Sequence, residues 1–296
     1  MILTLDIGNT TIGIYGMERT EDGDYRVVFS EKLSTLREQR NYLPLLRRPF
    51  SRTGIALGEI EGIALSSVVP RLDAPVGQAA ERLFGKPPVK IAARAAGLSY
   101  AIPQPEKVGL DRVADAAWAV RRYPLPAVTV DLGTATTFNV LDADGTFRGG
   151  LIAAGVETGL SALSERAAQL PKVDLNGPGG LIGRNTVECM RSGAVVGTAA
   201  LVDGVTARIE NQLGQAVTLV LTGGWARLVE PACLHAHVYD PWLLPKGLAL
   251  LYDLSAASSR GVHGWEPAKE CVGNNRLSAK GEYPSPQQRH FVKYDD

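Results

Sequence analysis

The sequence predicts an α/β protein whose fold is built twice, with two related lobes that each hold a mixed sheet flanked by helices. The first observation is the opening stretch, MILTLDIGNTT, in which an aliphatic run ends in Asp-x-Gly and breaks into small hydroxyl residues. The second is its return as VTVDLGTATT at residues 128–137, where Asp131 follows Asp6 by 125 residues. The third is that strand, Asp-Gly turn and strand succeed one another both times. Because this period is a whole domain, the pattern indicates duplication and not a solenoid of short repeats.

The elements of the first half follow from their residue patterns. Short runs rich in Val, Ile and aromatic residues predict strands at 2–5, 11–16, 25–30, 62–69 and 88–92. A helix is predicted around 74–84, where apolar residues recur three and four positions apart. A second helix is predicted from 110 or 111 to 122, with one apolar face and Pro124 to end it. The first third of the chain is therefore mixed α/β.

The second half restarts the same order. Strands are predicted in AVTVDLG, TTFNVLDADG, TFRGGLI and AVTLVLTGGW. The Asp-Gly pair that ends DADG at 142–145 is typical of a hairpin turn, because these residues readily adopt positive φ values. Helices are predicted near 159–169 and from about 185 toward 212. The restart at 127 is what makes the prediction one of two related lobes.

We expect an N-terminal lobe at 1–115, a C-terminal lobe at 116–253 and an irregular, flexible tail at 254–296. Length alone allows one large domain or two of ordinary size. The tail is rich in Ser, Gly, Pro, Asn and charged residues and has no periodic apolar pattern.

The charge balance argues against nucleic acid and membranes as partners. Lys plus Arg and Asp plus Glu both total 31, so the formal net charge is zero and no polyanion-binding surface is indicated. The first apolar run is interrupted by Asp6 and has no basic segment before it. No run approaches the roughly 18 apolar residues of a membrane span. We therefore expect a cytoplasmic protein.

The cysteines and histidines give no strong metal signal. Three widely separated cysteines predict neither a disulfide framework nor a zinc site, which fits a reducing compartment. His235 and His237 alternate as strand residues do and could face the same way. With no third ligand nearby, a polar edge is preferred to a metal site.

Each repeated turn has the chemistry of a phosphate cradle. Gly8 removes the Cβ that would keep a ligand from the backbone, so successive N–H groups can converge on an anion. Asn9, Thr10 and Thr11 add short donors, and Asp6 offers the hard oxygen ligand that hydrated Mg²⁺ between phosphates needs. The second turn repeats the arrangement with Asp131, Gly133, Thr134, Thr136 and Thr137. Two such turns, facing each other, would hold a nucleoside triphosphate between two lobes.

A single Asp-x-Gly is more often a plain β-turn in which Asp caps its own backbone, and this interpretation stays open for either copy alone. Two copies at equivalent places favour nucleotide binding. The later Leu-Thr-Gly-Gly at 221–224 adds a point where backbone could approach an adenosine. The chain has no Gly-x-x-x-x-Gly-Lys-Ser/Thr sequence, which disfavours a P-loop nucleoside triphosphatase.

These features resemble the superfamily of sugar kinases, heat-shock chaperones and actin, in which ATP lies between two related lobes. More narrowly, the chain resembles the type III pantothenate kinases in stretches that follow the family's order from residue 1 to about 253. They are DIGNT at 6–10, SSVVP at 66–70, VGLDR at 108–112, DLGTATT at 131–137, GGLIAAG at 149–155, IGRNTVECMRSG at 182–193, TGG at 222–224 and LPKGL at 244–248. The resemblance implies an actin-like, ribonuclease H-like fold with an ATP cleft between the lobes.

The resemblance also implies an activity: ATP-dependent phosphorylation of pantothenate to 4′-phosphopantothenate, the first step of coenzyme A biosynthesis. It implies Asp111 as general base and a monovalent cation, K⁺ or NH₄⁺, at Asp131. Members of the family work as homodimers, with the substrate site near the subunit interface, so a homodimer is expected. The implied ATP contacts are Asp6, Ile7, Gly8, Asn9, Thr10, Thr11, Ile12, Gly13 and Thr134.

The substrate side rests on Gly-Leu-Asp-Arg at 109–112. By residue type alone this is a helix N-terminal Asp followed by a solvated Arg. The resemblance favours a substrate site of Gly109, Leu110, Asp111 and Arg112, in which the planar fork of Arg112 reaches the pantothenate carboxylate. Thr186 matches a substrate-binding Thr of the family, although by itself it is equally a helix N-terminal hydroxyl.

Two positions depart from the family pattern. Some members carry Lys where this chain has Gly13, and others also lack it. The substrate-site Tyr usual in the family is Ile102 here, while Tyr100 lies two residues earlier and on the same face if the segment is a strand. Tyr100 is therefore either a shifted substrate residue or an ordinary strand aromatic.

Two other classes of function compete with the kinase. A non-catalytic regulator of the Bvg accessory factor type would keep the fold, but loss of Asp6, Asp111 or Asp131 would favour it and all three are present. An actin-like mechanical ATPase or chaperone would need a large partner-binding domain, for which the chain beyond 253 is too short and irregular.

Overall fold

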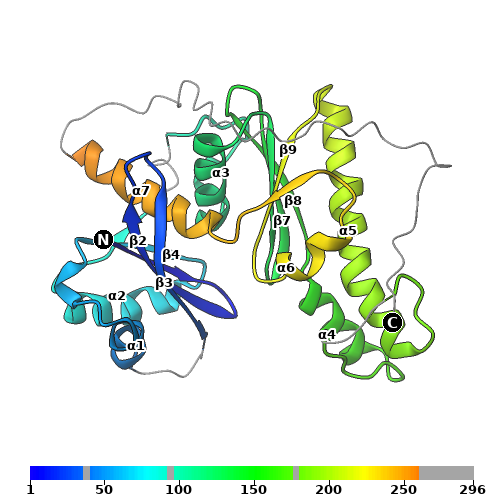
Figure 1. The fold of residues 1–296 in the computed structure, drawn as a ribbon, viewed down its shortest axis with the longest axis horizontal. Helices are drawn as coiled ribbons and strands as arrows, with labels where there is room; N and C mark the ends of the chain where they lie inside the picture. Colours follow the sequence, from blue (N-terminus) through cyan, green and yellow to red (C-terminus); the bar gives the residue numbers. More distant parts are fainter. Residues whose placement is uncertain (36–40, 92–96, 176–179, 260–296) are drawn as a thin grey trace. The chain divides into compact units, whose positions relative to one another are not determined.

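The computed structural model describes residues 1–35, 41–91, 97–175 and 180–259, and these contain two five-stranded sheets (Figure 1). The first sheet has the order β3-β2-β1-β4-β5 and the second β8-β7-β6-β9-β10. The strands of the first sheet are β1 (Ile2–Ile7), β2 (Thr11–Arg19), β3 (Tyr25–Ser34), β4 (Gly62–Ser67) and β5 (Val89–Lys90). Those of the second are β6 (Ala127–Leu132), β7 (Ala135–Leu141), β8 (Phe147–Ala154), β9 (Thr218–Thr222) and β10 (His237–Tyr239).

The two sheets share one topology. β1 pairs antiparallel with β2 and parallel with β4, and β2 pairs antiparallel with β3. β6 pairs in the same way with β7 and β9, and β7 with β8. The last strand of each sheet, β5 or β10, lies parallel to its neighbour. This strand-by-strand correspondence confirms the predicted duplication and the actin-like, mixed-sheet fold class.

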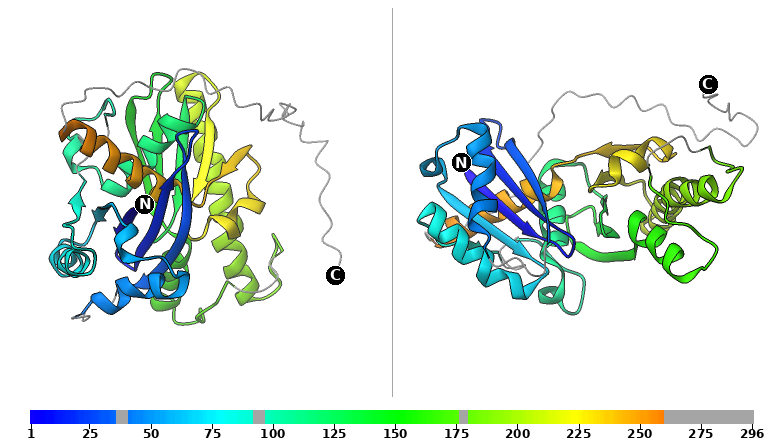
Figure 2. Two further views of the ribbon diagram at one scale, coloured as in Figure 1. Left: turned by 60° about the vertical axis from the view of Figure 1, so that its left-hand side comes forward. Right: turned by 90° about the horizontal axis from the view of Figure 1, so that it is seen from below.

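Helices cover the sheets on both sides. Figures 1 and 2 show α1 and α2 beside the first sheet and α5 beside the second. The helices are α1 (Leu43–Thr53), α2 (Pro70–Phe84), α3 (Leu110–Arg122), α4 (Val156–Arg166), α5 (Thr186–Leu213), α6 (Ala226–Val229) and α7 (Leu243–Ser259). Short 3₁₀ turns lie at η1 (Leu57–Glu59), η3 (Pro105–Lys107) and η4 (Glu230–Ala232).

Alternation along the strands gives each sheet two faces with different partners. Leu3 and Leu5 of the first sheet belong to a core that also holds residues of α1 and α2. Val128 of the second sheet belongs to a core with residues of α5. The opposite faces, represented by Tyr15 and Val220, share a third core with α3 and α7. These two helices therefore join the inner faces of the two sheets.

Helix α7 corrects the predicted start of the tail. The chain was expected to become irregular at 254, but α7 continues to Ser259, and the rest of the predicted tail lies outside the described residues. The helix packs closely on α3, because a Cβ at Gly247 would lie only 2.1 Å from the carbonyl oxygen of Ala114. Its sequence is apolar nearly all round, which is typical of a helix buried between layers and gives no amphipathic signal.

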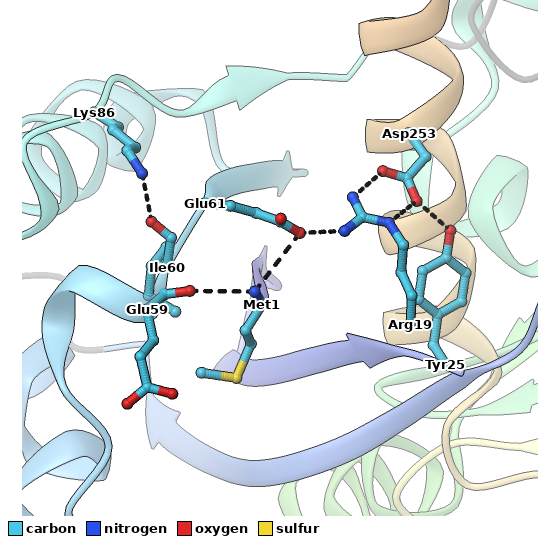
Figure 3. Close-up of polar contacts among 8 residues, drawn as sticks. All are labelled: Met1, Arg19, Tyr25, Glu59, Ile60, Glu61, Lys86 and Asp253. Carbon is cyan, nitrogen blue, oxygen red and sulfur yellow. Dashed lines mark hydrogen bonds and ion pairs between the residues drawn. The ribbon is translucent and has the colours of Figure 1, made fainter. Parts of the chain in front are cut away.

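Ion pairs also attach α7 to the first sheet, as Figure 3 shows. Asp253 accepts hydrogen bonds from Arg19 Nε (2.8 Å) and Nη2 (2.5 Å) and from the Tyr25 hydroxyl (2.7 Å). The other guanidinium nitrogen of Arg19 donates to Glu61, which also pairs with the α-amino group of Met1 at 3.6 Å. The network links α7 to β2, β3 and the start of β1.

Other elements differ from prediction at their ends. Helix α1 was not predicted, because Pro49 inside it argues against a helix in sequence terms. α2 begins at Pro70, four residues early, since proline is well accommodated in a first helical turn. α4 spans Val156–Arg166 instead of 159–169, and β5 has only two residues. Residue 92 of the predicted fifth strand lies outside the described residues.

Candidate active site

The two repeated turns meet. The hydroxyl oxygens of Thr10 and Thr134 lie 2.9 Å apart, although the residues are 124 positions apart in the chain. The first turn is closed by a hydrogen bond from the N–H of Gly8 to the carbonyl of Thr11 (2.9 Å) and supported by Thr35 Oγ1, which donates to the carbonyl of Gly8 (2.9 Å). Asn9, Thr10 and Thr11 are exposed, so their donors are open to a ligand.

The second turn is more enclosed. Its carbonyl at Thr134 accepts hydrogen bonds from the Gly155 N–H (3.2 Å) and from Thr158 Oγ1 (2.7 Å). Gly155 has to be glycine here, because a Cβ would lie 2.3 Å from the carbonyl oxygen of Gly133. The Thr-Gly-Gly turn after β9 also packs closely against the second turn. Gly223 has φ +98°, and a Cβ there would lie 2.2 Å from Asp131 Oδ1.

Asp6 and Asp131 occupy equivalent places at the ends of β1 and β6. Asp6 pairs with Gly13 of β2 and Ser66 of β4, while Asp131 pairs with Thr137 of β7 and Thr222 of β9. Burial, and after it the charge of Asp111, raises the pKa of Asp6 to about 7. The same two causes raise the pKa of Asp131 to about 6. The charge of Asp111, which comes from the helix between the sheets, therefore raises the pKa of both carboxyl groups.

Asp111 lies in the first turn of α3, where Gly109 makes room for it. A Cβ at Gly109 would lie 2.4 Å from Asp111 Oδ1, and the same oxygen accepts the Arg112 N–H at 2.8 Å. The side chain is half-buried. Because its charge acts on the carboxylates that end both β1 and β6, Asp111 lies within electrostatic reach of both turns.

Asp115, one helical turn further along α3, is a fourth carboxylate that the sequence analysis missed. It is 1% exposed, and its Oδ1 has no hydrogen-bond partner among the described residues. Burial raises its pKa well above the ordinary value, with further contributions from Asp131, Asp111 and Asp6 in that order. Its four-residue spacing from Asp111 puts both on one helix face, and this spacing was the available signal.

Arg112 turns toward the second sheet. Its Nε donates to Asn139 Oδ1 (2.7 Å) and its Nη2 to the carbonyl of Phe138 (3.2 Å). Its Cζ lies 5.6 Å from the centre of the Phe147 ring. Burial lowers the pKa of the guanidinium. Arg112 is thus half-buried and held in place, not solvated as its residue type alone suggested.

Tyr100 packs against the ring of Phe147, the same ring that Arg112 contacts. Its ring centre is 5.8 Å from that of Phe147, and the two residues form an isolated parallel bridge. Burial raises the pKa of its hydroxyl to about 12. The structure therefore brings Tyr100 and Arg112 together around Phe147, which the sequence alone did not indicate.

Thr186 begins α5, but it is not the residue that caps the helix. The cap is Asn185, whose side-chain oxygen accepts the Glu188 N–H at 3.0 Å. Thr186 instead lines a largely apolar groove of about 520 Å³ between α4 and α5, together with Gly155 and Met190. Since Gly155 contacts the second turn, this groove starts beside Thr134.

The remaining predicted ATP contacts can act only through the backbone. Ile7 and Ile12 point into the core under α1 and α2, and Gly13 has no side chain. Leu110 packs at the edge of the core around α3. The turns thus offer N–H groups, three exposed polar side chains at 9–11 and the hydroxyl of Thr134.

No group of three or more His, Cys, Asp or Glu side chains among the described residues could hold a metal ion by itself. A cation here would need ligands from phosphate, water or backbone in addition to one carboxylate. His235 and His237, the other candidates, contact Glu210 (3.1 Å) and Glu230 (3.5 Å).

No described helix has the length and apolar character needed to cross a membrane.

The duplicated lobes, with the same strand order in both sheets and their turns facing each other, define the class of two-lobed proteins with an actin-like fold. Within that class, the chain belongs to the type III pantothenate kinase family, whose model matches residues 2–208. A type III pantothenate kinase from Roseiflexus sp. (strain RS-1) is 38% identical over 258 residues, covering 86% of this chain and 99% of the relative. One from Thermomicrobium roseum is 38% identical over 256 residues, covering 86% and 97%.

One solved structure also supports the fold. A conserved protein from Campylobacter jejuni, described as a candidate Baf family transcriptional activator, superposes with a TM-score of 0.50. It is 19% identical and covers 86% of this chain and 98% of its own. This likeness supports the two-lobed architecture alone.

Proposed function

We propose that this chain transfers the γ-phosphoryl group of ATP to the primary hydroxyl of pantothenate, giving 4′-phosphopantothenate and ADP, the first step of coenzyme A biosynthesis. One observation carries the proposal: the hydroxyls of Thr10 and Thr134 meet at 2.9 Å, while Asp111 acts electrostatically on the carboxylate at the end of each turn's strand. A base placed between two phosphate-binding turns is the arrangement that phosphoryl transfer to an alcohol requires.

Asp111 is the proposed general base. It accepts the proton of the pantothenate hydroxyl as the oxygen attacks the γ-phosphorus in line. Because the transition state of phosphoryl transfer is loose, most of the rate comes from positioning and charge stabilisation, and an ordinary carboxylate suffices. Its place at the N-terminus of α3 keeps it half-buried and its orientation fixed by Gly109.

The turns are proposed to hold the triphosphate. The backbone from Asp6 to Gly13, with the side chains of Asn9, Thr10 and Thr11, binds phosphate oxygens from one side, and Thr134 does so from the other. Asp6 and Asp131 are half-buried carboxylates without an ion-paired partner among the described residues, which suits ligands of cations. Mg²⁺ at Asp6, through phosphate or water, and K⁺ or NH₄⁺ at Asp131 would offset charge between nucleotide and substrate when bound.

The substrate side is proposed to lie around Phe147. Arg112 has Nη1 left after Nε and Nη2 are engaged by β7, and a single remaining donor edge suits one carboxylate oxygen of pantothenate. Tyr100, Gly109 and Leu110 line the same end of α3. Thr186, which lines the groove that includes Gly155 beside the second turn, is proposed as a further substrate contact.

A homodimer is proposed because α5 and its surroundings leave an uncovered face in a single chain. A Cβ at Gly193 or Gly197 would meet nothing within 4 Å, while Ile152 is 66% and Leu163 50% exposed. Close packing against a second copy would cover them. Light scattering should give twice the chain mass for the wild type and a lower mass for Gly197→Arg.

The deciding experiment is ADP release measured with and without pantothenate in K⁺ buffer. The kinase predicts release that depends on pantothenate and stops when it is exhausted. A non-catalytic regulator of the Bvg accessory factor type would give no pantothenate-dependent release. Asp6, Asp111 and Asp131, which such a regulator would not need, are all retained.

A further inference from the structure

Lys32 stands in register with the first turn. On β3 it pairs with Gly13 of β2, which in turn pairs with Asp6 of β1. Directly paired residues in neighbouring strands lie on the same face of a sheet. The three positions therefore form one row across the sheet end, on the inner face that carries Asp6, with a carboxylate and an ammonium at its two ends. Gly13 between them has no side chain of its own, and the Tyr15 ring lies over it, since a Cβ at Gly13 would lie 2.5 Å from Tyr15 Cε2.

The ammonium of Lys32 reaches the opposite lobe. Its Nζ lies 4.0 Å from the position that a Cβ would take at Gly224, in the Thr-Gly-Gly turn after β9. The neighbouring Gly223 is the residue that presses on Asp131. Lys32 thus extends from the edge strand of the first sheet to the turn that borders Asp131. Its side chain therefore reaches from one lobe to the other.

Lys32 is close enough to act on the site's carboxylates but is not paired with them. It lowers the pKa of both Asp6 and Asp131 against the larger raising effects of burial and Asp111. It is exposed, and within the described part of the chain it forms no ion pair or hydrogen bond. An unpaired, long-stemmed cation beside several carboxylates is available for an incoming anion.

Such a cation would favour the binding of a polyphosphate chain, because it offsets the charge of the nearby carboxylates. Asp6, Asp111 and Asp131 carry negative charge toward the space between the turns and would repel phosphate oxygens at close range. The turns themselves offer the phosphate oxygens mainly neutral N–H and O–H donors. A lysine ammonium binds phosphate as a compact point charge and needs no fixed planar geometry, which suits a side chain reaching in from the sheet edge.

We propose that Lys32 binds the phosphate chain of the nucleotide and stabilises the charge that develops on the transferred phosphoryl group. The inference rests on the proposed function. In the step, the pantothenate oxygen forms its bond to the γ-phosphorus, the bond from that phosphorus to the bridging oxygen breaks, and its electron pair leaves with ADP. The hydroxyl proton goes to Asp111. Lys32 keeps its proton throughout and contributes charge alone.

The test compares Lys32→Met, Lys32→Arg and a matched control, Arg26→Met. Arg26 is an exposed cation on the same strand that pairs with Glu18, away from the turns. Removing one donor aimed at developing charge typically costs about 10²–10³-fold in kcat, so Lys32→Met should lose about 100-fold. Lys32→Arg should recover part of this loss, and Arg26→Met should stay within about twofold of wild type.

Nucleotide affinity gives a readout apart from turnover. Titration calorimetry with ATP and with AMP should show ATP binding weakened about tenfold in Lys32→Met, with AMP binding changed by less than about twofold. Unchanged ATP affinity, or equal losses for ATP and AMP, would overturn the inference. If wild-type protein binds ATP but releases no ADP with pantothenate, the proposed function fails, while the comparison of ATP with AMP still decides the role of Lys32.

Discussion

The two repeated turns share a topology but not an environment. The first, after β1, exposes Asn9 to Thr11 and accepts two hydrogen bonds from Thr35, one from its hydroxyl to the Gly8 carbonyl (2.9 Å) and one from its N–H to the Thr10 carbonyl (2.8 Å). The second, after β6, is pressed from two sides by Gly155 and Gly223. Duplication therefore preserved the strand, the carboxylate and the turn, while the surroundings made one turn open and the other rigid.

The difference suggests a division of labour. An open turn with free donors can close around phosphate as the nucleotide arrives. A rigid turn can hold a carboxylate and a cation at a fixed place, because its backbone has no room to move. α3 belongs to neither turn, and the proposed base Asp111 and the buried Asp115 both come from it.

The largest effect should come from Asp111, the residue that acts on both turns. Asp111→Asn keeps size and helix geometry but cannot accept the proton, so kcat should fall about 10³-fold. Steady-state kinetics with pantothenate measures this. Glu157→Gln is the matched control, since Glu157 is an exposed carboxylate in the first turn of α4. Retention of a tenth of wild-type activity by Asp111→Asn would remove Asp111 as the base.

The rigidity of the second turn can be tested by adding one methyl group. Gly223→Ala combines positive φ with a Cβ 2.2 Å from Asp131 Oδ1, and it should destabilise the protein by about 3 kcal/mol. Gly85→Ala is the control, since it has φ +69° with nothing within 4 Å and should cost only about 1 kcal/mol.

The first turn should be more tolerant of the same change. Gly8→Ala brings a Cβ to 3.1 Å from the Thr11 carbonyl without a positive φ. Urea unfolding should therefore rank the loss of stability for Gly223 well above that for Gly8. Equal losses at the two positions would show that the turns do not differ in rigidity.

A third effect concerns the cation proposed for the second turn alone. Replacing K⁺ by Na⁺ at constant ionic strength should lower kcat about tenfold, equivalent to about 1.4 kcal/mol, because Asp131 is held too rigidly to adjust to a smaller ion. Asp131→Asn should remove the difference between the two salts. Equal rates for the wild type in both would contradict the assignment.

Local chemistry was predictable from the sequence, whereas contacts across the fold were not. The Asp-x-Gly turns, α3 and the order of strands were recognised because their signals lie within a few residues. Lys32 was missed because only the pairing of β3 with β2 and of β2 with β1 places it in one row with Asp6. α7 was missed because Pro245 and Gly247 interrupt an apolar segment whose helix is stabilised by packing on α3.

The smallest expected effect compares how strongly the carboxylates at the two turns, Asp6 and Asp131, influence the pKa of Asp115. Its pKa is raised in the folded protein, so the folded state binds this proton more tightly than the unfolded state. The associated stability is fully present below the ordinary pKa of about 3.9 and is lost as pH rises through the raised value. In ligand-free protein, Asp115→Asn should leave stability near pH 4 unchanged and raise it at pH 8, where the wild-type carboxylate is ionised.

The two strand-end carboxylates should contribute unequally to that loss. Asp131 is the largest charged contributor to the raised pKa of Asp115, ahead of Asp6. Each Asn variant also removes a carboxyl group whose own pKa is raised, so the influence on Asp115 is isolated by repeating both changes in an Asp115→Asn background. The part of the flattening of the pH dependence that disappears in this background should be larger for Asp131→Asn than for Asp6→Asn, by roughly a few tenths of a kcal/mol in urea unfolding at fixed ionic strength. A larger effect from Asp6→Asn would mean that α3 is electrostatically closer to the open turn, and that Asp111 and Asp115 serve the nucleotide side of the site more than the cation side.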